Sequence, residues 1–336
     1  MISYVTTERE APRVRFSLSP LGEAVYSFRM LASPERRKPH RIWFEAIRSR
    51  LAENDLRLLR AVVPPTGYVP DFLTPPPGLR SPDFAEELEV VRSTRPEHFV
   101  DEVTWMVNDP ATPTAWRTAA GSLHRQMLAS PEKAIRRITD LLDRYWRAAL
   151  EPCWKRLRGS LLTDIRSRTR VMENTGVAPV LSSLNDRVGW DGTCLTVRSG
   201  YDFRENLDEQ GIVLVPSVFC GPEVLTMLPP QQAMLVYPRP GAAEVWQRQE
   251  SRRPSPLSAL LGGIRAAVLE ALVTPATTSE LAVEIGVTPG AVSQHLGVLR
   301  ECGLVVSRRA GRQVLHSLTE MGEALLRGAD PRHRTR

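Results

Sequence analysis

Residues 277–306 read TTSELAVEIGVTPGAVSQHLGVLRECGLVV, and this stretch decides the fold of the C-terminal part of the chain. Thr288 is a good N-cap for a helix, and Pro289 suits the first turn, where a missing N–H has no cost. Three apolar residues share one face of this helix at i, i+4 and i+7 spacing: Val292, Leu296 and Leu299. Gly303 stops the helix. The pattern predicts an amphipathic helix between Thr288 and Gly303.

A shorter amphipathic helix precedes it, with Leu281, Ala282 and Ile285 on one side. The connection, residues 286–288, reads GVT; it is short and contains glycine. Two short helices joined in this way are typical of a helix-turn-helix, the unit that places its second helix in the major groove of DNA.

The face of the second helix opposite its apolar side has almost no apolar area. It carries small or hydrogen-bonding residues: Gly290, Ser293, Gln294, Gly297 and Glu301. Gln294 offers a donor and an acceptor to adenine, and Ser293 suits a base or a phosphate. A solvated helix face has a similar composition, so the residues that follow decide between the two interpretations.

Two short β-prone runs follow in LVVSRRAGRQVLHSLT, residues 304–319, separated by a turn at Ala310-Gly311. The tip of the expected hairpin is basic and contains three arginines: Arg308, Arg309 and Arg312. A basic hairpin beside a recognition helix is a wing, which reaches phosphates or a minor groove. We expect His316, on the returning strand, to pack in the core.

From Leu257 onward, about the last quarter of the chain resembles the winged helix-turn-helix of the ArsR family of bacterial transcriptional regulators. The segments that carry the resemblance are Ser279-Glu280-Leu281-Ala282, Gly286-Val287-Thr288-Pro289, Val292-Ser293-Gln294-His295-Leu296, Leu299-Arg300, Gly303-Leu304-Val305 and Gly311-Arg312. The resemblance implies a homodimer whose dimer helices include residues 257–272 and 320–326.

The residues expected to contact double-stranded DNA lie on the second helix and the wing. They are Thr288, Gly290, Ser293, Gln294, His295, Arg300, Arg308, Arg309 and Arg312. We expect His295 to be half-buried near the DNA backbone. Arg300 suits a phosphate contact, although its place near a helix C-terminus is an equally adequate structural reason for an arginine.

The sequence predicts no metal site and no cofactor. Many ArsR-type sensors hold soft metals through paired cysteines just before the Leu-Ala of the first helix of the motif. Thr277 and Ser279 stand at the matching places here, and hydroxyls are poor ligands for soft metals. The four cysteines are widely spaced, without a C-x-x-C pair: Cys153, Cys194, Cys220 and Cys302. We expect Cys302 to be a small buried group or a helix-end residue, with redox sensing as the less favoured alternative.

One further pair has metal-ligand spacing. His98 and Glu102 lie at i, i+4 in EHFVDEV, with Asp101 close by. A metal site would need at least one more convergent ligand. We therefore interpret this segment as a surface helix with ordinary charges.

Composition sets broad limits. A chain of 336 residues with 42% hydrophobic residues has room for two or three domains with cores, and its formal net charge of +6 favours an anionic partner. The N-terminus, MISYVTTEREAPRVRF, contains acids and lacks an apolar h-region. No apolar run approaches the roughly 20 residues of a membrane span. We expect a cytoplasmic protein without a membrane role.

The first half of the chain is mostly helical in pattern. We expect an edge strand at 14–18, followed by helices at 21–31, 42–52, 56–63, within 83–107, 131–150 and 153–174. The proline-rich segment 64–82 contains Tyr68, Val69, Phe72 and Leu73, apolar groups that a flexible linker would not need. We predict that it is a fixed loop, packed on the helices and lining a cavity.

Beyond Gly176 the period of the pattern changes toward 2. The Asp191-Gly192 pair between β-prone runs predicts a hairpin, and 211–220 and 233–237 read as strands. The order of elements and the segment Tyr68-Val69-Pro70-Asp71-Phe72-Leu73-Thr74-Pro75 resemble a poorly characterised domain that bacterial regulators carry ahead of an ArsR-type winged helix. This resemblance implies no activity.

The fold class that follows is multi-domain and α-rich α+β. We expect a mainly helical sensor and dimerisation region at 1–176, a β-rich part at 177–240 and a linker at 241–256. The winged helix-turn-helix would occupy 257–328, and a basic tail 329–336.

The predicted function is sequence-specific DNA binding by a transcriptional regulator, as a dimeric repressor relieved by a small organic effector or a partner on the N-terminal domain. The sequence has no G-x-S-x-G elbow, no phosphate-binding G-x-x-x-x-G-K-[ST] loop and no H-E-x-x-H, so we expect no enzyme. Two alternatives stay open. One is an enzyme-like N-terminal domain that acts on a small metabolite, with the winged helix used for autoregulation or protein contacts. The other is a protein-interaction module, against which the arginine-rich tip of the hairpin argues.

Overall fold

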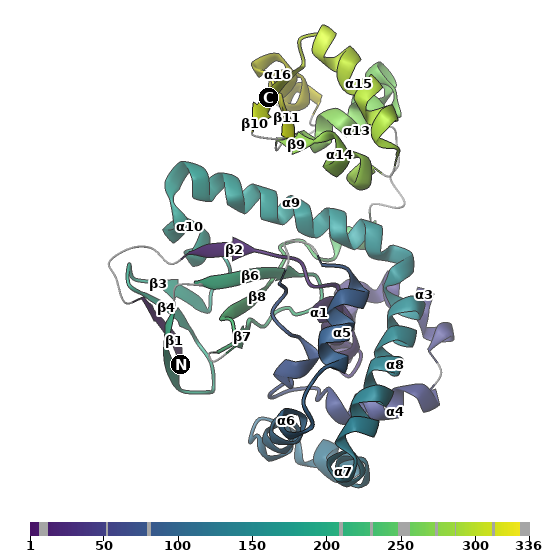
Figure 1. Cartoon of the computed structure of the whole chain (residues 1–336), viewed down its shortest axis with the longest axis vertical. Helices are drawn as coiled ribbons and strands as arrows, with labels where there is room; N and C mark the ends of the chain where they lie inside the picture. Colours follow the sequence, from purple (N-terminus) through teal and green to yellow (C-terminus); the bar gives the residue numbers. More distant parts are fainter. Residues whose placement is uncertain are drawn as a thin grey trace. The chain divides into compact units, whose positions relative to one another are not determined.

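The chain is a multi-domain, α-rich α+β protein made of two compact units, residues 1–246 and 247–336 (Figure 1). The computed structural model describes residues 1–6, 13–51, 53–78, 82–207, 211–228, 231–247, 256–272, 275–285, 287–310 and 313–329. Each unit has its own hydrophobic core and is described by itself.

Helices make up most of the N-terminal unit. In chain order they are α1 (Pro20–Met30), α2 (Pro34–Arg37), α3 (Arg41–Ile47), α4 (Glu53–Val62), α5 (Phe84–Arg92), α6 (Pro96–Asn108), α7 (Thr114–Ala129), α8 (Pro131–Ala149), α9 (Glu151–Thr175), α10 (Val177–Ser182) and α11 (Glu244–Gln247), with short 3₁₀ turns η1 (Lys38–His40), η2 (Arg48–Arg50) and η3 (Asp71–Leu73).

Local signals start several of these helices. The Ser19 side chain accepts the Gly22 N–H at 2.8 Å, and Pro20 occupies the first turn of α1. Asp83 and Glu86 form a reciprocal capping box at α5. The helices predicted over 21–31, 131–150 and 153–174 correspond to α1, α8 and α9.

Two four-stranded sheets complete the N-terminal unit. The strands are β1 (Ile2–Thr6), β2 (Val14–Phe16), β3 (Val188–Trp190), β4 (Cys194–Val197), β5 (Phe203–Leu207), β6 (Ile212–Ser217), β7 (Leu225–Met227) and β8 (Met234–Pro238). One sheet has the order β2-β6-β8-β7 and the other β3-β4-β1-β5. The first is mostly parallel, because β6 runs parallel to both β2 and β8.

Strand β6 is buried along its whole length because both of its faces are covered. Val213 and Val215 belong to the core formed with the helices, and Ile212 and Leu214 belong to a second core shared with the β3-β4-β1-β5 sheet. The β2-β6-β8-β7 sheet is therefore a central layer between the helices and the β3-β4-β1-β5 sheet (Figure 1).

The structure both confirms and extends the predictions for this unit. The Asp191-Gly192 hairpin is confirmed: Asp191 Oδ1 accepts the Thr193 and Cys194 N–H groups, and Gly192 has φ +103°. The edge strand after Val14 is confirmed as β2. The sequence interpretation did not anticipate β1, which lies between β4 and β5.

The proline-rich loop is fixed, as predicted. Phe72 and Leu73 are buried in the helical core. Three charged side chains from outside the loop accept from or donate to its backbone: Glu102 Oε2 accepts the Phe72 N–H at 2.9 Å, Asp109 Oδ2 accepts the Tyr68 N–H at 2.6 Å, and Arg29 Nη2 donates to Gly67 O at 2.8 Å.

The C-terminal unit contains the elements that the winged helix predicts. They are α12 (Pro256–Leu261), α13 (Gly263–Ala271), β9 (Ala276–Thr277), α14 (Thr278–Ile285), α15 (Pro289–Glu301), β10 (Val305–Ala310), β11 (Gln313–Leu318) and α16 (Glu320–Ala329). Its sheet has the order β10-β11-β9. Val292, Leu296 and Leu299 are buried in its core, as their spacing predicts.

Candidate nucleic-acid interface

Helix α15 begins as its sequence predicts. Thr288 has an extended backbone, and its Oγ1 accepts the Ala291 N–H at 3.3 Å. Pro289 follows in the first turn. The start of α15 lies at the surface. Its first residues are all exposed: Thr288, Pro289 and Gly290.

The outer face of α15 presents hydrogen-bonding groups with little steric cover. Ser293 and Gln294 are exposed, and no hydrogen bond to another described residue occupies either side chain. A Cβ at Gly290 or Gly297 would have no heavy atom of the described structure within 4 Å. A flat partner, such as the edges of base pairs, has room to approach the helix backbone here.

His295 and Arg300 occupy the flanks of this face. His295 is half-buried, at the border between the core side and the outer side of α15. Arg300 is exposed in the last turn. A cation there interacts favourably with the helix C-terminus whether or not it also contacts a phosphate.

The wing is an antiparallel hairpin of β10 and β11. Arg308 pairs with Leu315 and Arg309 with Val314, next to the turn. Both arginines are exposed. The predicted third arginine of the tip, Arg312, lies outside the described residues, as does Gly311.

His316 fixes the wing to the rest of the unit. It is buried, and its Nδ1 lies 2.8 Å from Ser307 Oγ on β10, while its Nε2 lies 3.1 Å from Thr278 Oγ1 at the start of α14. Burial, and secondly the charge of Arg300, lowers the pKa of His316. The prediction that His316 is packed in the core is confirmed, but the two hydroxyl partners were not foreseen, since neither is near in sequence.

Helix α14 also begins with a reciprocal cap. The Thr277 N–H donates to Glu280 Oε2 at 2.8 Å, and the Glu280 N–H donates to Thr277 Oγ1 at 3.3 Å. Thr277 is one of the two residues at the positions where the resemblance described above implies a thiol in a metal sensor. Its hydroxyl is used here to start a helix.

His98 and Glu102, the pair with metal-ligand spacing, are in contact with each other. His98 Nε2 lies 2.8 Å from Glu102 Oε1, and Glu102 is buried rather than part of an ordinary surface face. Its other oxygen holds the proline-rich loop. No group of three or more His, Cys, Asp or Glu side chains suited to a metal ion occurs in the described part of the chain.

Cys302 is exposed at the end of α15, where it is the C-cap residue. This position agrees with the prediction of a helix-end residue and not with that of a buried group.

Comparison with protein families matches two parts of the chain. Residues 3–241 match the family of unknown function DUF5937, and residues 265–307 match the bacterial regulatory protein, arsR family. The chain belongs to the DUF5937 family and carries an arsR-family helix-turn-helix at its C-terminal end. The arsR match begins within α13 and ends in the first strand of the wing.

Two curated relatives, both from Mycobacterium tuberculosis, match short stretches. The chain is 39% identical over 88 residues to the HTH-type transcriptional regulator NmtR. This match covers 22% of this chain and 73% of NmtR. The chain is also 43% identical over 70 residues to the HTH-type transcriptional regulator Rv2034. This match covers 20% of this chain and 65% of Rv2034. No solved structure matches.

This arsR-family member of DUF5937 is a DNA-binding transcriptional regulator. Within the described residues, none of its helices has the length and hydrophobicity that a membrane span needs.

Proposed function

We propose that this regulator is a homodimeric repressor that binds a specific operator and is released when a small organic effector binds the N-terminal unit. The observation that carries the DNA-reading part is the outer face of α15. Ser293 and Gln294 are exposed and free of hydrogen bonds to other described residues, and the glycines beside them leave the helix backbone open.

The base-reading and backbone-binding groups are separate. Gln294 and Ser293 are suited to base edges. Arg308 and Arg309 on the wing are suited to phosphates, and the predicted Arg312 would extend this basic tip. Thr288, His295 and Arg300 would hold the ends and flank of α15 against the DNA backbone.

Dimerisation is supported by an apolar surface on helices outside the DNA-reading motif. Helices α12 and α13 both pack on α16. These three helices expose large apolar side chains: Leu260 is 70% exposed, Ile264 38% and Met321 62%. A contiguous exposed apolar patch is typical of a protein interaction site, and we propose that these three side chains form one. A second copy that uses the same surface would bury it symmetrically.

Selection of bound fragments from genomic DNA tests the proposal. The expected result is an inverted repeat whose half-site centres lie about 34 to 36 Å apart, or a multiple of that distance. Enrichment of direct repeats, or of no shared sequence, would contradict it. The recovered operator would also show whether the bound site overlaps a promoter, as repression requires.

A further inference from the structure

The N-terminal unit contains a cavity of about 110 Å³ beside the proline-rich loop. Its wall is formed by Tyr26 of α1, by loop residues including Gly67 and Asp71, by Tyr201, and by apolar side chains of the central sheet and of the segment before it. Those apolar side chains include Val224, Leu225 and Met234. The cavity therefore has one polar side and one apolar side.

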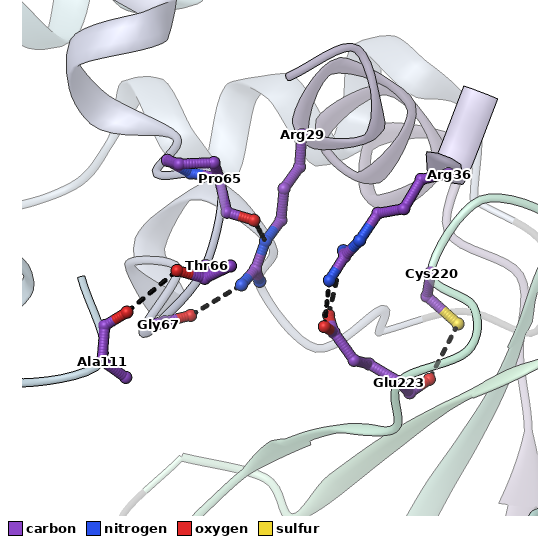
Figure 2. Close-up of polar contacts among 8 residues, drawn as sticks. All are labelled: Arg29, Arg36, Pro65, Thr66, Gly67, Ala111, Cys220 and Glu223. Atoms are coloured by element: carbon purple, nitrogen blue, oxygen red, sulfur yellow. Dashed lines mark hydrogen bonds and ion pairs between the residues drawn. The ribbon is translucent and has the colours of Figure 1, made fainter. Parts of the chain in front are cut away.

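A buried cation lies against the polar side. Arg29 of α1 is only 5% exposed. Its Nε donates to Pro65 O at 3.3 Å and its Nη2 to Gly67 O at 2.8 Å (Figure 2). Gly67 lines the cavity, so the guanidinium lies directly behind the cavity wall.

The charge of Arg29 is not balanced by a direct ion pair in the described structure, and its Nη1 has no hydrogen-bond partner there. The nearby carboxylate, Glu223, is held by Arg36, whose Nη1 donates to Glu223 Oε2 at 3.1 Å (Figure 2). Burial, opposed by the charge of Glu223, lowers the pKa of Arg29. The guanidinium has two carbonyl partners but no directly paired anion, so a bound anion that reaches Nη1 would stabilise this buried charge.

Tyr201 lines the cavity and lies close enough to Arg29 to interact with its charge. It also lines an open hollow that contains Trp105, an indole that is 53% exposed. Its hydroxyl donates a hydrogen bond of 2.6 Å to Asp109 Oδ2, and its backbone N–H donates to Ser199 Oγ at 3.2 Å. Since Arg29 Nη1 is buried, a neighbouring side chain would have to shift for a ligand to reach it, and we assign this movement to Tyr201.

Among the described residues that line the cavity, Asp71 is the one with a carboxyl group, and it is compatible with an anion at neutral pH. Burial, and secondly the charge of Glu102, raises the pKa of Asp71 to about 8. The groups that face Asp71 are Tyr68 of the same loop, Glu102 of α6 and Tyr4 of β1, and none of them is a cation. At pH 7 Asp71 is therefore mainly protonated and is a hydrogen-bond donor.

The volume limits the ligand to a few heavy atoms. A cavity of roughly 150 Å³ holds a molecule of the size of benzene. Because one side of the cavity is apolar, we expect the ligand to have a hydrocarbon part in addition to its anionic head.

We propose that this cavity binds a short-chain monocarboxylate, with its carboxylate on Arg29 and its hydrocarbon part against Val224, Leu225 and Met234. The proposal of a binding site rests on the geometry of the cavity and of Arg29 alone. Its role as the site of the effector rests on the proposed function.

Calorimetry on the full-length protein with sodium butyrate tests the site. Butyramide and butylamine are matched probes that keep the chain length and remove or reverse the charge. Butyrate should bind at least tenfold more tightly than either. Equal binding of butyrate and butyramide, stronger binding of butylamine, or no butyrate binding would overturn the proposal. Inorganic phosphate that binds more tightly than butyrate would also overturn it.

Two variants act on different sides of the cavity. Arg29→Met removes the charge, and Val224→Phe fills the apolar side without altering Arg29; each should weaken butyrate binding at least tenfold. The matched control is Arg41→Met, since Arg41 is exposed on the same unit and pairs with Glu45. If Arg29→Met does not fold, Val224→Phe alone decides, and unchanged binding by a folded Val224→Phe protein would exclude this cavity.

The pH dependence is a further readout. Asp71 becomes negative as the pH rises through about 8, so butyrate binding should weaken between pH 7 and 9. Asp71→Asn cannot ionise and should keep its affinity over that range. A wild-type affinity that rises with pH would overturn the assignment of an anionic ligand.

Operator binding, measured separately, distinguishes this inference from the proposed function. Butyrate binding without a change in operator affinity would leave the site intact and remove its effector role. Operator binding by a protein that does not bind butyrate would leave the DNA reader intact and overturn the site.

Discussion

At the scale of single residues, Gln294 is the side chain on which recognition of a specific DNA sequence should depend most. Replacing Gln294 by Ala should cost about 1 to 3 kcal/mol of binding free energy on the operator and much less on random DNA, because only base-edge contacts are sequence-specific. Fluorescence anisotropy with both DNAs measures this. Gln126→Ala, at an exposed glutamine of the N-terminal unit, is the control. Equal losses on both DNAs would assign Gln294 to the backbone.

Arg309 should behave differently. Arg309→Ala removes an exposed guanidinium from the wing. Its loss should weaken binding to all sequences similarly and lower the salt dependence by about one phosphate contact. Titrations at four salt concentrations give the slope. A slope equal to that of the wild-type protein would mean that Arg309 does not contact phosphate; the same experiment applies to Arg312.

At the scale of elements, His316 determines how firmly the wing is held. His316→Leu keeps the position filled but leaves the Ser307 and Thr278 hydroxyls without their ring partners. We expect a loss of about 1 to 3 kcal/mol in the stability of the C-terminal unit and faster amide exchange in β10 and β11. Val314→Thr changes an exposed residue of the same strand and should leave both unchanged. Exchange rates that do not respond to His316→Leu would show that strand pairing alone fixes the wing.

Elements that form through short-range interactions could be predicted from the sequence, whereas those that depend on long-range interactions could not. Thr288 with Pro289 starts α15, and Asp191-Gly192 turns a hairpin, because each signal acts within a few residues. The pairing of β1 with β5, by contrast, joins residue 2 to residue 203. No local pattern contains that information.

The same limit applies to the sites. The exposed face of α15 could be predicted because helical periodicity alone assigns its sides. The cavity beside Arg29 could not be predicted in detail, since its wall comes from α1, the loop, β7 and β8, and the segment at Ser199 and Tyr201. The proline-rich loop with its apolar residues was the one local indication of a cavity.

At the scale of the whole molecule, buried carboxyls should make the N-terminal unit less stable as the pH rises. Burial raises the pKa of Glu23, Asp71 and Glu87 to about 8 in each case. The folded unit therefore retains protons that the unfolded chain releases above about pH 4. Its unfolding free energy should fall as the pH rises from about 5 to 8, and Glu23→Gln should reduce this dependence.

Tryptophan fluorescence isolates this effect. All 7 tryptophans lie before residue 247, so denaturant unfolding followed by their emission reports the N-terminal unit alone. Glu97→Gln, at an exposed position, is the control and should leave the pH dependence unchanged. A stability that rises toward pH 8 would contradict the assignment of these carboxyls as protonated in the folded state.

The oligomeric state is also a property of the whole molecule. Met321→Glu places a charge in the proposed apolar surface of α12, α13 and α16, and burying it would be costly. The variant should sediment as a monomer and bind the operator more weakly. Val90→Glu, at an exposed valine of the N-terminal unit, is the control. A Met321→Glu protein that sediments as the wild-type dimer would place the dimer surface elsewhere.

The position of β1 has a consequence for how the chain is made. Residues 2–6 lie between β4 and β5, and their parallel partner, residues 203–207, is translated about 200 residues later. At roughly 5 to 20 residues per second, β1 waits about 10 to 40 s on the ribosome before its neighbours emerge. The N-terminal unit therefore completes its fold late in synthesis, and a fusion that sterically occupies the first strand should reduce the yield of folded protein.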